Sequence, residues 1–228
     1  MRRLSIPSLP DPSLGQDGSF VESVNVGPIR VVEWRGDRVA TGIWKAPVAG
    51  RVSVQGVNVV GDDQADRTAH GGSDKAAYVY GREDYDWWAR QLGHELEPGT
   101  FGENLTVQGV SATAAVVGER WRIGTVLLEV SQPRLPCYKL GIRMNDARFP
   151  RRFAAAGRPG TYLRIVQPGE LAAGDSIEVV HRPDHGLTVG DVAHIYLRDH
   201  SQVDRLLHVQ ELSDDWHRWA RDRRSKGA

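Results

Sequence analysis

Short runs of apolar residues, interrupted by Gly, Pro and Asp, fill the chain from about residue 21 to residue 180. Two of these runs flank Gly124-Thr125, which is the pattern of a β-hairpin closed by a short turn. Many short strands with frequent turn signals favour a barrel or a sandwich over a fold in which strands and helices alternate. Further strands are predicted at 48–60, 161–166 and 176–181.

One segment within this β-rich region has helical periodicity instead. Apolar and aromatic residues recur at helical spacing from Tyr85 to Leu92, and Gly93 then ends the pattern. Glu83 and Asp84 precede them, at a position where acidic side chains favour a helix N-terminus. We interpret the aromatic residues of this helix as core residues.

The pattern changes after His181, where a linker at 182–186 leads into helical sequence. The aromatic residues Trp216 and Trp219 are interpreted as core. We therefore divide the chain into a flexible N-terminal segment (1–20), a β-rich domain (21–182) and a small all-α domain of three helices (186–228), packed on itself or on the β-rich domain. Three helix starts are predicted, two of them with capping-box-like spacing: Thr188 with Asp191, Ser201 with Asp204, and Ser213.

The chain has 29 basic and 29 acidic residues among 228, so its formal net charge is zero. This balance predicts no nucleic-acid partner, and the basic C-terminus is interpreted as a solvated helix end. No stretch approaches the ~20 apolar residues that span a bilayer, and no apolar segment of a secretory signal follows the N-terminus. Because the chain also has a single cysteine, we expect a cytoplasmic protein without membrane contact.

That cysteine, Cys137, lies in the run SQPRLPCYK at 131–139. Two prolines restrict the backbone before the sulfur, and Arg134 and Lys139 place positive charge beside it. Neighbouring cations favour the thiolate, which is the form that attacks an electrophile or binds a metal. A buried structural cysteine is the alternative interpretation.

A polar segment at 61–75 joins two apolar strands. It contains Gly71, Gly72 and Lys75, which could hold an anion through backbone N–H groups and an ammonium group. Taken alone, the segment also fits a long surface loop with a Gly-Gly turn. Its glycine and lysine spacing does not match a P-loop.

A second polar segment, at 99–105, contains Asn104. The amide of Asn104 could orient a polar heterocycle through paired donor and acceptor contacts, or it could satisfy its own turn. Considered together with the Cys137 run and the Gly-Gly segment, it suggests one composite site. Such a site would hold a phosphorylated cofactor whose reactive end needs a sulfur ligand.

Three blocks of sequence resemble the signature blocks of the MOSC domain, which is shared with molybdenum cofactor sulfurases. They read HGGSDK at 70–75, FGENL at 101–105 and SQPRLPCYK at 131–139. Their order is similar to that in stand-alone bacterial MOSC proteins with a C-terminal three-helix extension. KAPV at 45–48 and GDDQAD at 61–66 also match. The resemblance covers roughly residue 43 to the C-terminus.

The resemblance implies a mainly β fold, a MOSC-type β-barrel with a few helices, that binds the molybdenum–pyranopterin cofactor. Cys137 would be the thiolate ligand to molybdenum. The resemblance also implies, at the level of the domain alone, an association with pyridoxal phosphate binding. The remaining expected contacts are Lys45, Lys75 and Arg134 to the cofactor phosphate, Gly71 and Gly72 as backbone donors, His70, Asn104 and Gln132 to pterin or substrate, and Lys139 as a cation beside the thiolate.

The resemblance further implies a molybdenum-dependent oxidoreductase that reduces N-hydroxylated compounds such as hydroxylamino purines, amidoximes and hydroxylamines, as a detoxification. His70 is the candidate acid that assists loss of oxygen. A single cysteine excludes a four-thiolate Fe–S cluster, and no dinucleotide fingerprint is present, so an external reductase is expected to supply electrons. A monomer or a homodimer is expected.

Two alternatives remain at this point. One is a non-catalytic carrier of the molybdenum cofactor or of sulfur, the latter as a persulfide on Cys137. The other is a Cys–His hydrolase that uses Cys137 and His70, although no cysteine-protease signature surrounds the thiol.

Overall fold

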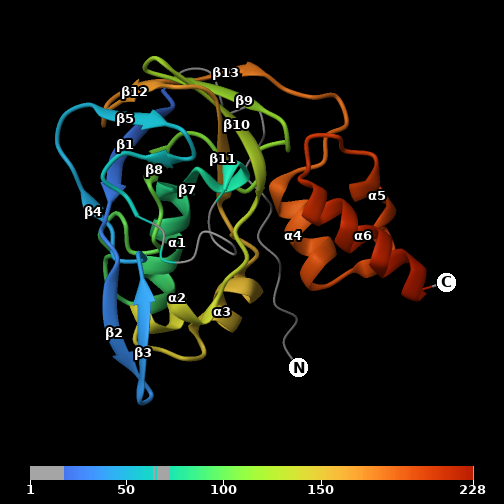
Figure 1. Ribbon diagram of the computed structural model, residues 1–228, viewed down its shortest axis with the longest axis horizontal. Helices are drawn as coiled ribbons and strands as arrows, with labels where there is room; N and C mark the ends of the chain where they lie inside the picture. Colours follow the sequence, from blue (N-terminus) through green and yellow to red (C-terminus); the bar gives the residue numbers. More distant parts are fainter. Residues whose placement is uncertain (1–17, 64, 66–71, 228) are drawn as a thin grey trace.

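The computed structural model describes residues 18–63, 65 and 72–227 (Figure 1). The predicted N-terminal segment, 1–20, lies almost wholly outside these residues, as do His70 and Gly71. Within the described part of the chain, no helix combines the length and the apolar character that a membrane span requires.

An eight-stranded sheet forms the centre of the molecule. Its neighbouring strands are antiparallel, with the exception of one parallel pair, β7 with β8. The order across the sheet is β13 (Ile177–His181), β9 (Arg120–Ile123), β10 (Val126–Pro133), β11 (Thr161–Gln167), β7 (Ala77–Gly81), β8 (Leu105–Gln108), β1 (Phe20–Val26) and β4 (Ala46–Pro47).

Two small sheets flank this central sheet. One joins β12 (Gly169–Leu171), β5 (Val52–Gln55) and β6 (Asn58–Val59). The other is the hairpin of β2 (Arg30–Trp34) and β3 (Asp37–Thr41), which extends away from the rest of the molecule in Figure 1.

The fold is mainly β, as predicted, but the central sheet does not form the closed barrel that was expected. One edge of β1 pairs with β8, and the opposite edge pairs with β4 only at Asn25 and Val26. At the start of β1, an isolated bridge joins Phe20 to Ser176, just before β13. Main-chain hydrogen bonds from Val21 N to Asp175 O (2.9 Å), from Gly174 N to Val21 O (2.8 Å) and from Ile177 N to Ser19 O (2.9 Å) reinforce this contact. These two segments are therefore joined by a few main-chain contacts and not by a regular ladder of paired strands.

The hairpin predicted around Gly124 is confirmed, since Ile123 of β9 pairs with Val126 of β10. Gly124 has a φ of 56°, which glycine adopts without strain. A Cβ atom at this position would also lie 2.5 Å from the carbonyl oxygen of Glu170. Glycine is thus required both by the turn and by the close approach of a neighbouring strand.

The predicted helix is α1 (Arg82–Leu92), and it ends at Gly93 in the left-handed conformation, as expected. The β-rich region contains two further helices that the sequence pattern did not predict, α2 (Tyr138–Arg143) and α3 (Phe149–Ala156), and a 3₁₀ turn, η1 (Ser73–Lys75). Both helices are too short for an apolar periodicity to stand out.

The C-terminal segment contains α4 (Val189–Leu197), the 3₁₀ turn η2 (His200–Gln202), α5 (Asp204–Leu207) and α6 (Asp214–Gly227). The capping box of Thr188 with Asp191 is confirmed. The one predicted at Ser201 is wrong: the side chain of Asp199 accepts the hydrogen bond from Ser201 N and begins η2 instead.

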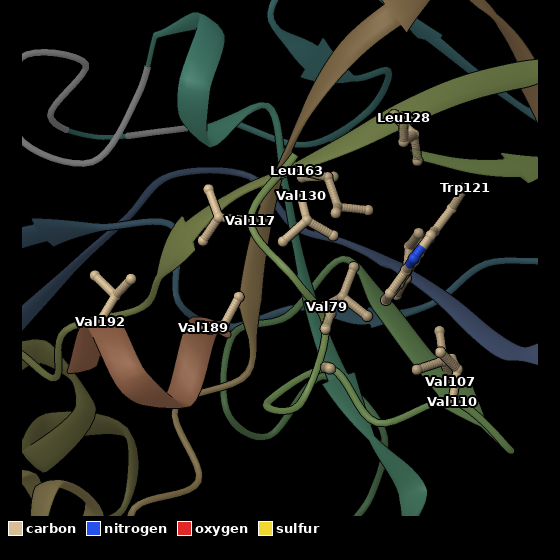
Figure 2. Close-up of a cluster of buried hydrophobic side chains, with 14 of the residues drawn as sticks. Val79, Val107, Val110, Val117, Trp121, Leu128, Val130, Leu163, Val189 and Val192 are labelled. Carbon is tan, nitrogen blue, oxygen red and sulfur yellow. The ribbon is translucent and has the colours of Figure 1, made fainter. Parts of the chain in front are cut away.

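These helices share an apolar core with the sheet. Figure 2 shows Val189 and Val192 of α4 beside Val117 and Val130, and all four are buried in one hydrophobic cluster. Main-chain hydrogen bonds from Val189 N to Ala115 O and from Val117 N to Leu187 O fasten the start of α4 to the β-rich region. Of the two arrangements predicted, the helices therefore adopt packing on the sheet.

The block at 101–105 is held together by a buried carboxylate, Glu103. Its Oε1 accepts hydrogen bonds from Gly99 N (2.6 Å), Thr106 Oγ1 (2.8 Å) and the Tyr85 hydroxyl, and its Oε2 accepts one from Phe101 N (3.1 Å). Burial raises the pKa of Glu103 above its ordinary value, and the donated hydrogen bonds counteract that rise. Glu103 therefore fixes the turn between α1 and β8.

We expect Glu103→Gln to lower the free energy of unfolding by about 1–3 kcal/mol, because the carboxamide sets an N–H2 group against buried donors. Because the raised pKa means that the folded wild type holds this proton more tightly than the unfolded chain, the linked stability is present at low pH and is lost as pH rises through the folded pKa. The deficit of the variant should shrink over that range in urea titrations between pH 4 and 8. The exposed Glu178→Gln is the control; equal effects of the two variants would contradict this account.

Candidate functional site

A cleft of about 380 Å³ lies where the end of β10 meets the C-terminal helices. Its size is within the range of ligand sites, roughly 300–1,000 Å³. The β-rich region contributes one wall, and α4 and α6 contribute the other. The lining residues are Lys75, Gln132, Pro133, Leu135, Pro136, Cys137, Tyr162, Tyr196, Asp215, Trp216 and Trp219.

Cys137 lies half-buried in this cleft, directly before α2. The pairing of β10 with β11 ends at Pro133, opposite Thr161, since a proline has no N–H to continue the ladder. The chain then leaves the sheet, and the Pro133–Cys137 segment carries the thiol to the cleft surface. The prolines that the sequence singled out thus determine where the sulfur lies.

Lys75 reaches the cleft at the end of η1. The hydroxyl of Ser131 on β10 lies 2.6 Å from the carbonyl oxygen of Asp74, and the Asp74 carboxylate forms an ion pair with Arg164 of β11 at 2.9 Å. These contacts fix η1 against the two strands and so position Lys75. Lys75 and Cys137 therefore line the same cleft.

Arg134 is buried, with 6% of its surface exposed, beneath the Cys137 segment. Its guanidinium lies 5.1 Å from the ring centroid of Tyr78 and 5.4 Å from that of Phe153, a cation–π arrangement. No carboxylate among the described residues forms an ion pair with Arg134, and its Nη1 atom is buried without a hydrogen-bond partner.

Such a charge is costly unless an anion compensates it. Burial pulls the pKa of Arg134 down, and the nearby ionisable groups of Tyr78, Tyr162 and Cys137 more than offset this, so that its pKa lies above the ordinary value. A thiolate at Cys137 is therefore one stabilising partner. The Nη1 atom, which has no hydrogen-bond partner, could donate to a second anionic group. The phosphate of a cofactor is a group of this kind.

Gln132 lines the cleft at the end of β10, and its Oε1 accepts a hydrogen bond of 2.9 Å from the indole Nε1 of Trp216. Trp216 is buried, and Trp219 one turn later is half-buried; the ring of Tyr196 lies 5.3 Å and 4.8 Å from theirs. Interpreting the two tryptophans as core was therefore incomplete. Because they belong to a distant part of the chain, no local spacing could have indicated their place in the site.

Lys45 does not line the cleft. Its ammonium group forms an ion pair with Asp62, and both side chains are buried. Burial lowers the pKa of Lys45, and Asp62 counteracts that effect. Asp62 Oδ1 also accepts a hydrogen bond from Gly27 N at 3.1 Å. The charge of Lys45 is thus neutralised within the fold.

Asn104 does not line the cleft either, because its amide is used by the backbone. Its Oδ1 accepts a hydrogen bond from Tyr78 N (3.0 Å), and its Nδ2 donates to Asp62 Oδ2 (2.9 Å) and to Asn25 O (3.3 Å). These contacts join β7, β1 and the loop after β6. The amide therefore does not satisfy its own turn, as one prediction had it, but joins segments that are distant in the sequence.

The remaining predicted residues are dispersed. Lys139 lies half-buried on α2 and does not line the cleft, and Gly72 is exposed at the start of η1. His70 and Gly71 lie outside the described residues. The structure thus brings together Cys137, Lys75 and Gln132 in one cleft, with Arg134 buried beside them.

Comparison with known proteins identifies the class. A MOSC domain model matches residues 66–178. The chain is 33% identical over 204 residues to the uncharacterized protein YflK of Bacillus subtilis, with 88% of this chain and 92% of that one covered. It is 33% identical over 152 residues to a protein of Gibberella moniliformis named reductase, covering 65% of this chain and 27% of that one.

The crystal structure of YiiM from Geobacillus stearothermophilus superposes with a TM-score of 0.76 at 28% identity, covering 90% of this chain and 99% of that one. YflK and the Geobacillus stearothermophilus YiiM structure thus match 88% and 90% of this chain, respectively. This chain belongs to the MOSC-domain family.

The charge beside Cys137 can be measured through its alkylation. Because Cys137 is the sole thiol, iodoacetate and iodoacetamide label one site, and the ratio of their rates cancels the thiolate population. We expect Arg134→Gln to lower this ratio by about three- to tenfold, since the anionic reagent loses a nearby cation. Arg122→Gln, an exposed control, should leave the ratio unchanged. An unchanged ratio in Arg134→Gln would show that the guanidinium does not act on the cleft.

Proposed function

We propose that this MOSC protein is a molybdenum-cofactor-dependent reductase of N-hydroxylated compounds, with Cys137 as the protein ligand to molybdenum. The observation that carries the proposal is the pairing of a half-buried thiol with a buried guanidinium that lacks a carboxylate partner. A thiolate ligand and an anionic cofactor would satisfy both groups.

The donor set fits the cofactor. Cys137 would offer a soft thiolate, and Arg134 and Lys75 would neutralise anionic oxygens. Gln132 supplies a polar amide in the same cleft. When bound, the cofactor would supply the two-electron chemistry that cleaves an N–O bond.

The aromatic wall would exclude water from the bound ligand. Tyr196, Trp216 and Trp219 cover the side of the cleft opposite the thiol, and a drier site strengthens every electrostatic contact inside it. The proton that accompanies loss of oxygen is assigned to His70 on sequence grounds. Of the three predicted phosphate contacts, Lys45 is omitted because Asp62 neutralises it, and Arg134 and Lys75 are kept.

The relatives support the chemistry at the level of the family. A protein named reductase shares 33% identity with this chain over 152 residues, although it is much longer. A cytoplasmic location, where reduced thiols persist, suits a thiolate ligand.

Elemental analysis combined with reduction of a panel of amidoximes and hydroxylamino purines tests the proposal. Wild type should retain molybdenum and reduce at least one member of the panel. Cys137→Ala should lose reduction by at least about a hundredfold, since the metal loses its protein ligand, while Ser201→Ala, an exposed control, should match wild type. Full activity in Cys137→Ala would refute the role of the thiolate. Retention of molybdenum without any reduction would favour the carrier alternative.

Electrons are expected to come from a separate protein. With one cysteine and no dinucleotide fingerprint, the purified chain should not oxidise NADH in the presence of substrate. Addition of a reductase or of an artificial one-electron donor should start turnover. Chromatography measures this turnover as the disappearance of substrate. Turnover with NADH alone would contradict this division of labour.

A further inference from the structure

We infer that Trp216 is a positioning residue, which sets the orientation of the Gln132 amide and so gives the cleft a fixed hydrogen-bond donor beside Cys137. The inference deepens the proposed function and rests on it only for the identity of the ligand. It assigns to the C-terminal helices a part in the site itself.

The direction of the hydrogen bond follows from chemistry. An indole N–H is a donor and cannot accept, so the atom of Gln132 that lies 2.9 Å from Trp216 Nε1 must be the carbonyl oxygen Oε1. The two ends of the amide are thereby distinguished without reference to the rest of the network. The NH2 group is left on the other side of the amide.

That NH2 group has no use elsewhere among the described residues. Gln132 is 6% exposed and lines the cleft. Its Nε2 donates to no acceptor among the described residues, and it is not one of the buried polar atoms without a hydrogen-bond partner. Lys75 lines the same cleft as Gln132 and contributes a cation to it. The amide donor of Gln132 adds a second group suited to an acceptor oxygen or ring nitrogen of a ligand.

Both partners of the Trp216–Gln132 hydrogen bond are held in place by their surroundings. Trp216 is buried and packs edge-on against Tyr196 at 5.3 Å, while Gln132 is held in β10 by its pairing with Tyr162. A side-chain amide that would otherwise rotate is therefore fixed from both sides. Ligand binding then carries no additional loss of conformational entropy for ordering this amide.

The first test uses the protein without cofactor. In NMR hydrogen exchange, the indole N–H of Trp216 should exchange on the order of tenfold more slowly than that of Trp219, because a buried hydrogen bond protects it. In Trp216→Phe, the Gln132 side-chain amide signals should move towards those of a solvated glutamine. Equal exchange at the two tryptophans, or unmoved Gln132 signals, would overturn the inference.

The second test is a double-mutant cycle on the ratio of iodoacetate to iodoacetamide labelling at Cys137. Trp216→Phe and Gln132→Ala should each lower the ratio, by about two- to fivefold for the loss of one hydrogen bond to a carboxylate. The double variant should be no lower than Gln132→Ala, since Trp216 acts through Gln132. Additive losses would show that Trp216 acts by packing alone, and would overturn the inference.

Two further variants separate positioning from stability. Gln132→Glu keeps an acceptor for Trp216 but removes the donor, so the Trp216 N–H should stay protected while the labelling ratio falls. Trp88→Phe removes an equally buried indole hydrogen bond, 2.9 Å to the Tyr80 hydroxyl, and should leave the ratio unchanged. A fall in Trp88→Phe equal to that in Trp216→Phe would refute a specific role.

The same variants relate the inference to the proposed function. In protein loaded with cofactor, Trp216→Phe and Gln132→Ala should release molybdenum on dialysis about two- to fivefold faster than wild type, as expected for one lost hydrogen bond. If the chain binds no molybdenum but the labelling cycle is non-additive, the proposed function fails and the positioning role stands. If molybdenum binds and the cycle is additive, the positioning role fails alone.

Discussion

The constraint on which the site depends is the burial of the Arg134 guanidinium without a carboxylate partner among the described residues. The protein accommodates this charge by laying it against the rings of Tyr78 and Phe153. An aromatic face lowers the cost of a buried cation but does not replace an anion. We propose that a ligand with negative charge compensates this buried cation beside Cys137.

Around Arg134, the residues that support the fold are different from the residues that are available to a ligand. Asp62, Glu103 and Asn104 belong to the family signature or its flanks, yet their hydrogen bonds support the fold. Asn104 joins β7, β1 and Asp62, and Glu103 fixes the turn before β8. The groups left for a ligand lie on η1, at the end of β10 and on the C-terminal helices. A residue in a signature block therefore need not contact the ligand. A residue that holds the turn next to the reactive loop can be as strongly restricted in type as one that binds the ligand.

Sequence reasoning succeeded where the signal was local. The turn at Gly124, the helix that ends at Gly93 and the cap at Thr188 each depend on a few neighbouring residues. It failed where several local partners compete, as at Ser201, and where a helix is too short for periodicity, as in α2. Barrel closure and the Trp216–Gln132 hydrogen bond could not be predicted, since both join residues far apart in the chain.

X-ray absorption at the molybdenum edge tests the central claim most directly, namely that the sulfur of Cys137 binds the metal. Protein loaded with cofactor should be measured as wild type and as Cys137→Ser, which exchanges one sulfur for one oxygen at the same position. The account predicts that the number of sulfur neighbours falls by one in the variant. An identical sulfur count in the two proteins would contradict it.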